Sequence, residues 1–266
     1  MRDFNGRVAA ITGAGSGIGR ALARNLASQG AALALCDIDE VGLAETVGMC
    51  EGAGVKVTSQ RVDVADRAAV YAWADQVVAD HGKVNLIFNN AGVALGATVA
   101  EMKYEDFEWL MSINFWGVVH GTQAFLPHLK AAHDGHVVNI SSVFGLVSIP
   151  SQSAYNAAKF AVRGFTDALR IELDAAKCGV SATTVHPGGI KTNIARNMRG
   201  DASHAANFDR IARTTPERAA REILAAVTAN RRRALIGVDA NVIDLLARLP
   251  GSFLHRLISF GNARRG

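Results

Sequence analysis

Two side chains able to handle a proton stand four residues apart in the middle of the chain. Tyr155 and Lys159 fall within Ala154–Ala176, a stretch whose pattern predicts a helix. Residues four apart lie on the same face of a helix, so the phenol and the ammonium can share one pocket. A free phenol has a pKa of about 10, and a nearby cation favours the phenolate and lowers that pKa. The pair therefore predicts a tyrosine that exchanges a proton with an alcohol oxygen.

A serine and an asparagine are candidates to assist this pair. Ser142 follows the apolar segment His136–Ile140, which reads as a buried strand, so its hydroxyl can hold the reacting oxygen. Asn114 lies on an otherwise apolar surface inside the long helical pattern Tyr104–Lys130. A buried asparagine needs partners, so it is either a satisfied core amide or part of a bend that binds water beside Lys159. A Tyr-x-x-x-Lys pair alone occurs by chance in many helices, and the surrounding segments decide its meaning.

A glycine-rich turn follows the first apolar segment of the chain. Val8–Ile11 leads into Thr12-Gly-Ala-Gly-Ser-Gly-Ile-Gly19, after which apolar residues repeat at helical spacing. A strand, a glycine-rich turn and a helix in this order are typical of a dinucleotide site, because glycines let the backbone approach a pyrophosphate. The cofactor contacts expected from this turn are Gly13, Ser16, Gly17, Ile18 and Gly19.

An acidic residue directly follows the second predicted strand, Ala31–Cys36. At the end of a second strand, about 20 residues beyond the glycines, a carboxylate accepts hydrogen bonds from ribose hydroxyls and repels a 2′-phosphate. Asp37 has this position, and its neighbours Ser16, Ile38 and Asp39 offer no cation to such a phosphate. The sequence therefore predicts NAD rather than NADP.

Three further predicted strands end in small or polar residues. These strands are Val55–Val62, Val84–Phe88 and Val180–Val185. Asp63 either contacts the adenine edge or caps its own turn, whereas small residues after the other strands allow close backbone approach. The remaining expected cofactor contacts are Asp63, Val64, Asn90, Ala91, Gly92, Pro187, Gly188, Ile190 and Thr192, together with Tyr155 and Lys159.

Strands and helices alternate from end to end without a linker or a repeat. This pattern predicts one α/β domain over residues 1–266, a doubly wound parallel sheet with helices on both faces and ligands at the strand carboxyl ends. Residues of about 190–215 mix polar and apolar side chains and are expected to form a lid. The tail of about 241–266 reads as two short amphipathic helices broken at Pro250. We expect it to pack on the domain or a neighbouring subunit, with a membrane surface as the alternative.

Composition excludes several classes of protein. Hydrophobic residues make up 49% of 266 residues, enough for a well-buried core, and the net charge of +4 comes without a basic stripe for nucleic acid. Three scattered cysteines and eight histidines show no ligand spacing, so neither a disulfide scaffold nor a metal site is expected. The first residues lack a signal-peptide pattern, and no window is apolar enough to span a bilayer. A cytoplasmic protein is the expectation.

Taken together, these segments resemble the short-chain dehydrogenase/reductase family over essentially the whole chain. The matching pieces are Thr12-Gly-Ala-Gly-Ser-Gly-Ile-Gly, Asn89-Asn-Ala-Gly, Asn114, Ser142, Tyr155-Asn-Ala-Ala-Lys159 and Pro187-Gly. The resemblance implies a Rossmann fold, an NAD(P) site, and homotetramers or dimers built partly from the helices Tyr104–Lys130 and Ala154–Ala176. The catalytic residues that it implies are Asn114, Ser142, Tyr155 and Lys159.

The resemblance also implies a mechanism. Tyr155 takes the proton of a secondary alcohol while a hydride passes to the nicotinamide, and Lys159 lowers the pKa of the tyrosine and holds the ribose. Ser142 orients the substrate oxygen, and Asn114 supports a proton relay through water. The candidate pocket walls are Val93, Leu95, Phe144, Leu146, Ile149, Ile194 and Met198. Since most of them are apolar, we expect a hydrophobic secondary alcohol or ketone, such as a steroid-like or lipid-derived molecule.

Two other functions compete with this prediction. An NADP-dependent carbonyl or 3-oxoacyl reductase would use the same fold, and Asp37 argues against it. A catalytically silent nucleotide-sensing protein would be expected to have lost part of the tetrad, and all four residues are present.

Overall fold

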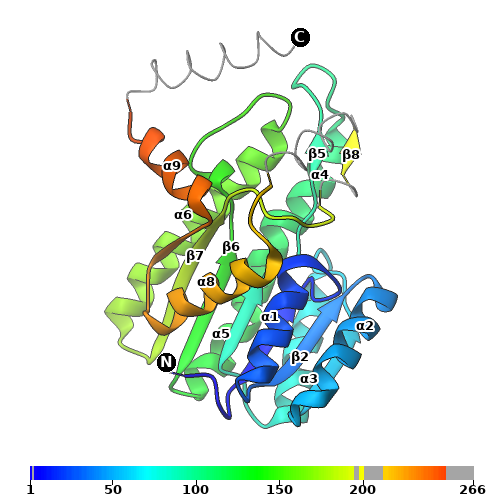
Figure 1. Cartoon of the computed structure of the whole chain (residues 1–266), viewed down its shortest axis with the longest axis vertical. Helices are drawn as coiled ribbons and strands as arrows, with labels where there is room; N and C mark the ends of the chain where they lie inside the picture. The colour runs from blue at the N-terminus through cyan, green and yellow to red at the C-terminus, as the bar shows by residue number, and fades with distance from the viewer. Residues whose placement is uncertain (2, 195–197, 201–211, 250–266) are drawn as a thin grey trace.

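A seven-stranded parallel sheet forms the centre of the molecule (Figure 1). The computed structural model describes residues 1, 3–194, 198–200 and 212–249. In spatial order the strands are β3 (Val57–Arg61), β2 (Ala32–Asp37), β1 (Val8–Thr12), β4 (Leu86–Asn89), β6 (Gly135–Ile140), β7 (Val180–Pro187) and β9 (Arg233–Ile236). The strand order reverses between β1 and β4, as in a doubly wound sheet, so the predicted fold is confirmed.

Helices cover both faces of this sheet (Figure 1). The first face packs against α1 (Gly17–Ser28), α2 (Glu40–Cys50) and α8 (Pro216–Thr228). The opposite face packs against α3 (Arg67–His81), α5 (Gly117–Ala131) and α6 (Ser153–Ala176). All five residues of β1 and all six of β6 are buried, as expected for central strands of a parallel sheet covered on both faces.

The sequence predicted one long helix over Tyr104–Lys130. The structure shows that this segment is not a single α-helix. It is divided into α4 (Tyr104–Met111), a π-helical turn over Ser112–Trp116, and α5. Such a turn adds a residue to the helix and is frequent at functional sites. Because the apolar pattern continues on both sides of the turn, periodicity alone cannot reveal it.

Two short strands that the sequence did not predict form a separate small sheet. β5 (Leu95–Gly96) pairs in parallel with β8 (Arg199–Gly200). In addition, Ile190 and Thr214 form an isolated parallel β-bridge. Both pairings involve the predicted lid. Residues 195–197 and 201–211 of this lid lie outside the described residues.

The tail begins as a helix, earlier than the sequence predicted. α9 (Val238–Leu246) starts two residues after β9, and the second predicted tail helix, beyond Pro250, lies outside the described residues. β3 is shorter than the predicted Val55–Val62, and most of its residues are exposed because it is an edge strand. In the part of the chain that the structure describes, no helix has the length and apolar character needed to cross a membrane.

Candidate active site

The carboxyl ends of the central strands bring the predicted site residues to one edge of the sheet. The residues at or just after these ends are Gly13 (β1), Asp37 (β2), Asn90 (β4), Ser142 (β6) and Pro187 (β7). The amino-terminal half of α6 adds Tyr155 and Lys159, because the turn Val143–Gly145 after β6 packs against this helix. Residues far apart in the sequence thus converge, as the alternating pattern predicted.

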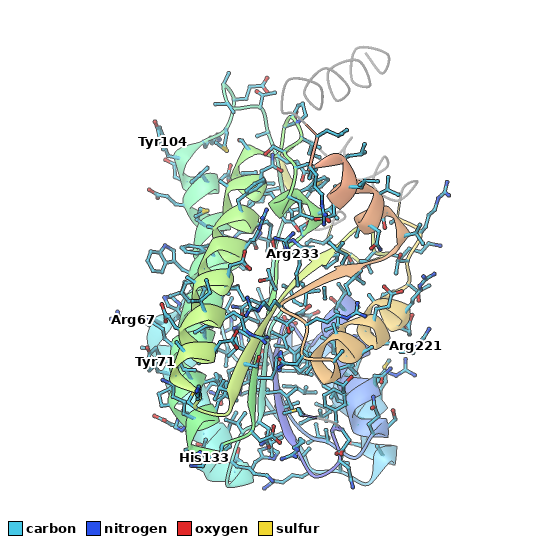
Figure 2. All side chains as sticks on the ribbon, turned by 90° about the vertical axis from the view of Figure 1, so that its left-hand side faces the viewer. Arg67, Tyr71, Tyr104, His133, Arg221 and Arg233 are labelled. Atoms are coloured by element: carbon cyan, nitrogen blue, oxygen red, sulfur yellow. The ribbon has the colours of Figure 1, made fainter. Side chains whose placement is uncertain are left out.

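Tyr155 and its neighbours form the chemically suggestive centre. The Ser142 side chain acts on the Tyr155 hydroxyl and favours its phenolate form, and the Tyr155 ring packs edge-on against Phe144, with centroids 6.3 Å apart. The Lys159 Nζ lies 5.4 Å from the centroid of the Tyr155 ring. The other two tyrosines, Tyr71 and Tyr104, lie on outer surfaces and are 41% and 85% exposed (Figure 2).

The pKa of the central tyrosine moves opposite to the sequence-based expectation. Burial raises the pKa of Tyr155 to about 12, although the hydrogen bond from Ser142 favours the phenolate. Burial also lowers the pKa of Lys159 to about 8. The Lys159 ammonium donates to the carbonyl of Ile140 at 3.0 Å, and desolvation is the dominant influence on both groups. In the cofactor-free protein Lys159 therefore does not offset the cost of burying the phenolate.

Replacing Lys159 with methionine should stabilise the cofactor-free protein, most strongly below pH 8. Lys159 is 3% exposed, and burying its charge is costly. Between its folded pKa of about 8 and the ordinary lysine value of about 10.4, only the unfolded chain keeps the proton, so wild-type stability rises with pH. Urea unfolding at pH 7.0 and 9.5 should therefore show the advantage of methionine shrinking by about 1–2 kcal/mol. Lys130→Met, at an exposed site on α5, is the control. An advantage independent of pH would contradict the prediction.

Asn114 is buried in the π-helical turn, and both the oxygen and the nitrogen of its side-chain amide form a hydrogen bond. Its Oδ1 accepts from the backbone N–H of Val93, and its Nδ2 donates to the carbonyl of the same residue, both at 2.8 Å. The amide thus ties the turn to the segment after β4, where Gly92 lies beside Asn114 and Lys159. These two bonds agree with the interpretation of Asn114 as a satisfied core amide. A water-binding bend beside Lys159 stays a prediction.

Neighbouring backbone packs so closely against the glycine-rich turn that side chains do not fit at Gly13 and Gly19. Gly13 has φ +65°, and a Cβ on it would lie 2.8 Å from the Cα of Ala91. A Cβ on Gly19 would collide with the carbonyl of Gly13. The Asn90 amide donates to the carbonyls of Thr12 and Gly13 at 2.9 and 3.1 Å, which holds the turn against β4. Ser16 caps α1 in extended conformation without a side-chain hydrogen bond, and Gly17 and Ile18 begin the helix.

Asp37 lies beneath the glycine-rich turn. Its carboxylate accepts from the backbone N–H of Gly15 at 2.7 Å and from that of Asp39 at 3.0 Å. Across the sheet its paired residue is Arg61 at the end of β3, 4.0 Å from Glu40. The sequence-based argument that no cation lies near Asp37 considered only its sequence neighbours and missed Arg61.

The loop after β3 places Asp63 and Val64 beside the site. Asp63 accepts from the backbone N–H of Ala65 at 2.9 Å, so it caps its own turn, while the predicted adenine contact stays untested. Val64 is buried against Gly117, where an added Cβ would lie 2.8 Å from the Val64 Cγ2.

The loop after β7 closes over the same edge. Gly188 donates to the carbonyl of Ile236, and Gly189 donates to the Asp239 carboxylate at 2.6 Å. The Thr192 Cγ2 lies 3.0 Å from where a Cβ on Gly17 would stand, so this residue faces the glycine-rich turn. Ile190, in contrast, is 3% exposed and packs into the core, which leaves its predicted nicotinamide contact without support.

Several predicted pocket walls cluster around Tyr155. Phe144 touches its ring, and Leu95 belongs to a buried cluster against which both Val93 and Tyr155 pack. Leu146 is buried on the turn after β6, and Met198 directly precedes β8, which pairs with β5. Ile149 and Ile194 are half-buried.

β8 is fastened to the wall of this site by Arg199. Its guanidinium stacks on the Trp109 ring, 3.7 Å from the centroid, and reaches the Asp106 carboxylate at 3.2 Å. Its backbone N–H donates to the carbonyl of Ala94 at 3.1 Å. We call Arg199, Asp106 and Trp109 the latch.

Comparison with known proteins identifies this arrangement. The family model for short chain dehydrogenases matches residues 7–203. SadH of Mycobacterium tuberculosis, an oxidoreductase by its given name, is 52% identical over 270 residues, covering 99% of this chain and 98% of SadH. The chain belongs to the short-chain dehydrogenase/reductase family.

Solved structures of this family agree closely in shape. A short-chain dehydrogenase/reductase from Burkholderia phymatum in complex with NAD is 35% identical, with a TM-score of 0.88 and coverage of 92% of this chain and 94% of its own. A short-chain dehydrogenase from Mycobacterium paratuberculosis bound to NAD is 29% identical, with a TM-score of 0.75 and coverage of 84% and 91%.

Sequence reasoning also missed Arg20 and Asp239, which support the site of this short-chain dehydrogenase/reductase. Arg20 joins α1 to α2 by hydrogen bonds to the carbonyl of Gly42 at 3.1 Å and to Glu45 at 2.8 Å. Asp239, on the first turn of α9, holds the loop after β7. No spacing rule marks either residue, because each acts across elements distant in the sequence. Within the described residues, no three His, Cys, Asp or Glu side chains are grouped to hold a metal ion.

Proposed function

We propose that this protein is an NAD-dependent oxidoreductase that interconverts apolar secondary alcohols and ketones. The observation that carries the proposal is the convergence of Ser142, Tyr155 and Lys159 at the strand edge, beside apolar walls. A phenol that can exchange a proton, a hydroxyl that can hold an oxygen and a nearby cation suit the chemistry of a carbonyl and its alcohol.

The residues present fit a dinucleotide. Side chains at Gly13 and Gly19 would collide with neighbouring backbone, so the turn keeps bare peptide at the amino-terminal end of α1, where a pyrophosphate binds. Thr192 faces this turn from the loop after β7. A bound nicotinamide would supply the hydride chemistry.

The chain's own residues would orient the substrate and handle its proton. Tyr155 would remove the alcohol proton as the phenolate, or donate it to a ketone in the reverse direction. The Ser142 hydroxyl would hold the substrate oxygen beside the phenol. Lys159, buried next to Tyr155, would favour the phenolate while it carries its charge. Asn114 would keep the π-helical turn in place through its bonds to Val93.

The preference for NAD rests on Asp37. A carboxylate at the end of β2 favours ribose hydroxyls and opposes a 2′-phosphate. The two solved relatives described above contain NAD. Arg61, paired with Asp37 across the sheet, is the observation that favours the second candidate, an NADP-dependent carbonyl or 3-oxoacyl reductase.

Absorbance of the reduced nicotinamide tests the function directly. The protein would be mixed with NAD or NADP and a panel of secondary alcohols, from 2-propanol to 2-octanol and cyclohexanol, with lactate as a small charged comparison. We expect turnover with NAD that increases with the apolar surface of the alcohol. Turnover confined to NADP would favour the second candidate, and turnover confined to lactate would contradict the apolar substrate. Binding of NADH without any turnover would favour the nucleotide-sensing alternative.

Breaking the latch should weaken substrate binding and leave cofactor binding unchanged. Arg199→Ala removes the stacking on Trp109 and the ion pair with Asp106, which together fasten β8 beside the site. A cation–π contact and a partly exposed ion pair are each worth about 0.5–1 kcal/mol, so we expect KM for 2-octanol to rise by at most about 5- to 30-fold. Arg232→Ala is the matched control, since that arginine pairs with Asp174. An unchanged KM would show that β8 does not shape the substrate site.

We further propose that the protein forms a homo-oligomer, a tetramer or a dimer, built partly from the helical segment Tyr104–Lys130 and from α6. Trp116, Phe160 and Ile171 belong to the π-helical turn and α6, and they are 51%, 39% and 64% exposed. Exposed apolar side chains of this size are typical of a subunit interface. Sedimentation of the wild type and of Ile171→Glu tests the proposal, with a shift to monomers as the expected result.

A further inference from the structure

A buried histidine stands directly behind Ser142. His186 lies on β7, is 0% exposed, and its Nδ1 is 2.8 Å from the backbone carbonyl oxygen of Ser142. A carbonyl oxygen only accepts hydrogen bonds, so Nδ1 must carry the proton and donate. Burial lowers the pKa of His186 to about 4, which keeps the ring neutral at physiological pH. The other nitrogen, Nε2, is buried and has no hydrogen-bond partner among the described residues.

The segment that His186 contacts is the one that aims Ser142. Ser142 precedes the turn Val143–Gly145, and its Oγ accepts from the backbone N–H of Phe144 at 3.1 Å. On the α6 side the segment is fixed by Ser141, whose hydroxyl donates to the carbonyl of Lys159 at 2.8 Å. Gly145 packs so closely against the same carbonyl that an added Cβ would collide with it. On the β7 side, among the described residues, His186 is the one whose side chain forms a hydrogen bond with the Ser142 carbonyl.

We propose that His186 is a positioning residue, which holds the Ser142 backbone so that the Ser142 hydroxyl meets Tyr155 and the substrate oxygen. The inference deepens the proposed alcohol chemistry and rests on it for its kinetic consequence. His186 does not contact the reacting atoms. It acts through the Ser142 carbonyl, which also accepts from the N–H of Gly145 at 2.9 Å. A shift of this carbonyl would carry the hydroxyl with it.

The stability of the protein depends less on this histidine than its burial suggests. The Ser142 carbonyl keeps its bond from Gly145 when the His186 bond is removed. Replacement by leucine, similar in size, would also remove the unpartnered Nε2, and an unpaired buried acceptor is itself destabilising. The loss of positioning and the loss of folding can therefore be separated by substitution.

Two substitutions at this position and one elsewhere make the test. His186→Leu removes the donor, whereas His186→Asn keeps an N–H at the same distance along the side chain. His136→Leu is the matched control, because His136 is 2% exposed on the neighbouring strand β6 and its Nε2 lies 2.8 Å from the Thr183 hydroxyl. For each protein we would measure kcat and KM with NAD and 2-octanol, the Kd for NADH, and amide exchange of residues 143–147.

The expected result is a specific loss in the leucine variant. His186→Leu should lower kcat about tenfold, since small misplacements of reacting groups cost this much or more. It should also speed amide exchange at residues 143–147 about tenfold, with the Kd for NADH unchanged. His186→Asn should keep kcat and the amide exchange rates close to the wild-type values. His136→Leu should change neither kcat nor these exchange rates.

Three results would overturn the inference. The first is a His186→Leu protein with the kcat and the amide exchange rates of the wild type. The second is a His186→Asn protein whose kcat and exchange rates change as much as those of His186→Leu. The third is a His136→Leu protein with the same loss of kcat as His186→Leu. Absence of alcohol turnover in the wild type would instead remove the proposed function. The exchange measurement would still decide whether His186 holds the turn.

Discussion

Changing Tyr155 to phenylalanine should reduce kcat about 10²- to 10⁴-fold, the contribution of a positioned general acid or base. The substitution removes one hydroxyl and keeps the ring that packs against Phe144. The hydrogen bond with Ser142 would be lost, but the Ser142 Oγ would still accept from the backbone N–H of Phe144. Folding should therefore change little, and NADH should still bind through the glycine-rich turn, so the main loss would fall on the proton transfer.

Tyr104→Phe provides the matched control for this measurement. Tyr104 is 85% exposed at the start of α4 and should tolerate the loss of its hydroxyl with unchanged kcat. The two variants and the wild type would be compared by kcat with NAD and 2-octanol, NADH fluorescence titration and thermal unfolding. A Tyr155→Phe protein that keeps more than about a tenth of the wild-type kcat would refute Tyr155 as the proton-transfer residue.

Changing Asp37 to asparagine should reduce the preference for NAD over NADP about 100-fold, measured as the ratio of the two kcat/KM values. Hydrogen bonds to a charged acceptor are worth about 1.5–3 kcal/mol, so the loss of charge alone should weaken NAD binding at least tenfold. NADP should gain because the carboxylate no longer repels its 2′-phosphate and because Arg61 lies on the paired position of β3. Asparagine keeps the size of the side chain and can still accept from Gly15.

Asp39→Asn tests whether the effect belongs to Asp37 or to negative charge in general. Asp39 caps α2 by accepting from the backbone N–H of Gly42 at 3.1 Å, and asparagine is an equally good cap. This variant should keep the wild-type cofactor ratio. If the ratio in Asp37→Asn moves less than about threefold, Asp37 contributes less than one charged hydrogen bond to the choice. Its role would then be confined to supporting the turn through Gly15.

The order of elements could be predicted because it depends on local patterns. Short apolar runs, glycine-rich turns and helical periodicity are all visible within about 20 residues. They located the strands at the centre of the main sheet, and the parallel topology then required the residues after those strands to meet at one edge. The cofactor turn and the Tyr155/Lys159 pair followed from the same reasoning.

Errors arose where the outcome depended on residues distant in the sequence. The π-helical turn at Asn114 is stabilised by bonds to Val93, on the segment after β4. Arg61 comes beside Asp37 through strand pairing. The pKa of Tyr155 is raised because burial, which spacing does not reveal, acts more strongly than the hydrogen-bonding influence of Ser142.

The sequence by itself determined the fold class, the dinucleotide turn and the residues able to carry the chemistry, because these are properties of short segments and of their order. The tertiary structure alone decided how those residues are supported. His186 holds the Ser142 carbonyl, Asp239 holds Gly189, and Arg199 fastens β8. Each of these contacts joins elements that only folding brings together. Burial then sets the strength of the contact, because a hydrogen bond or a charge that is removed from water interacts only with the few groups around it.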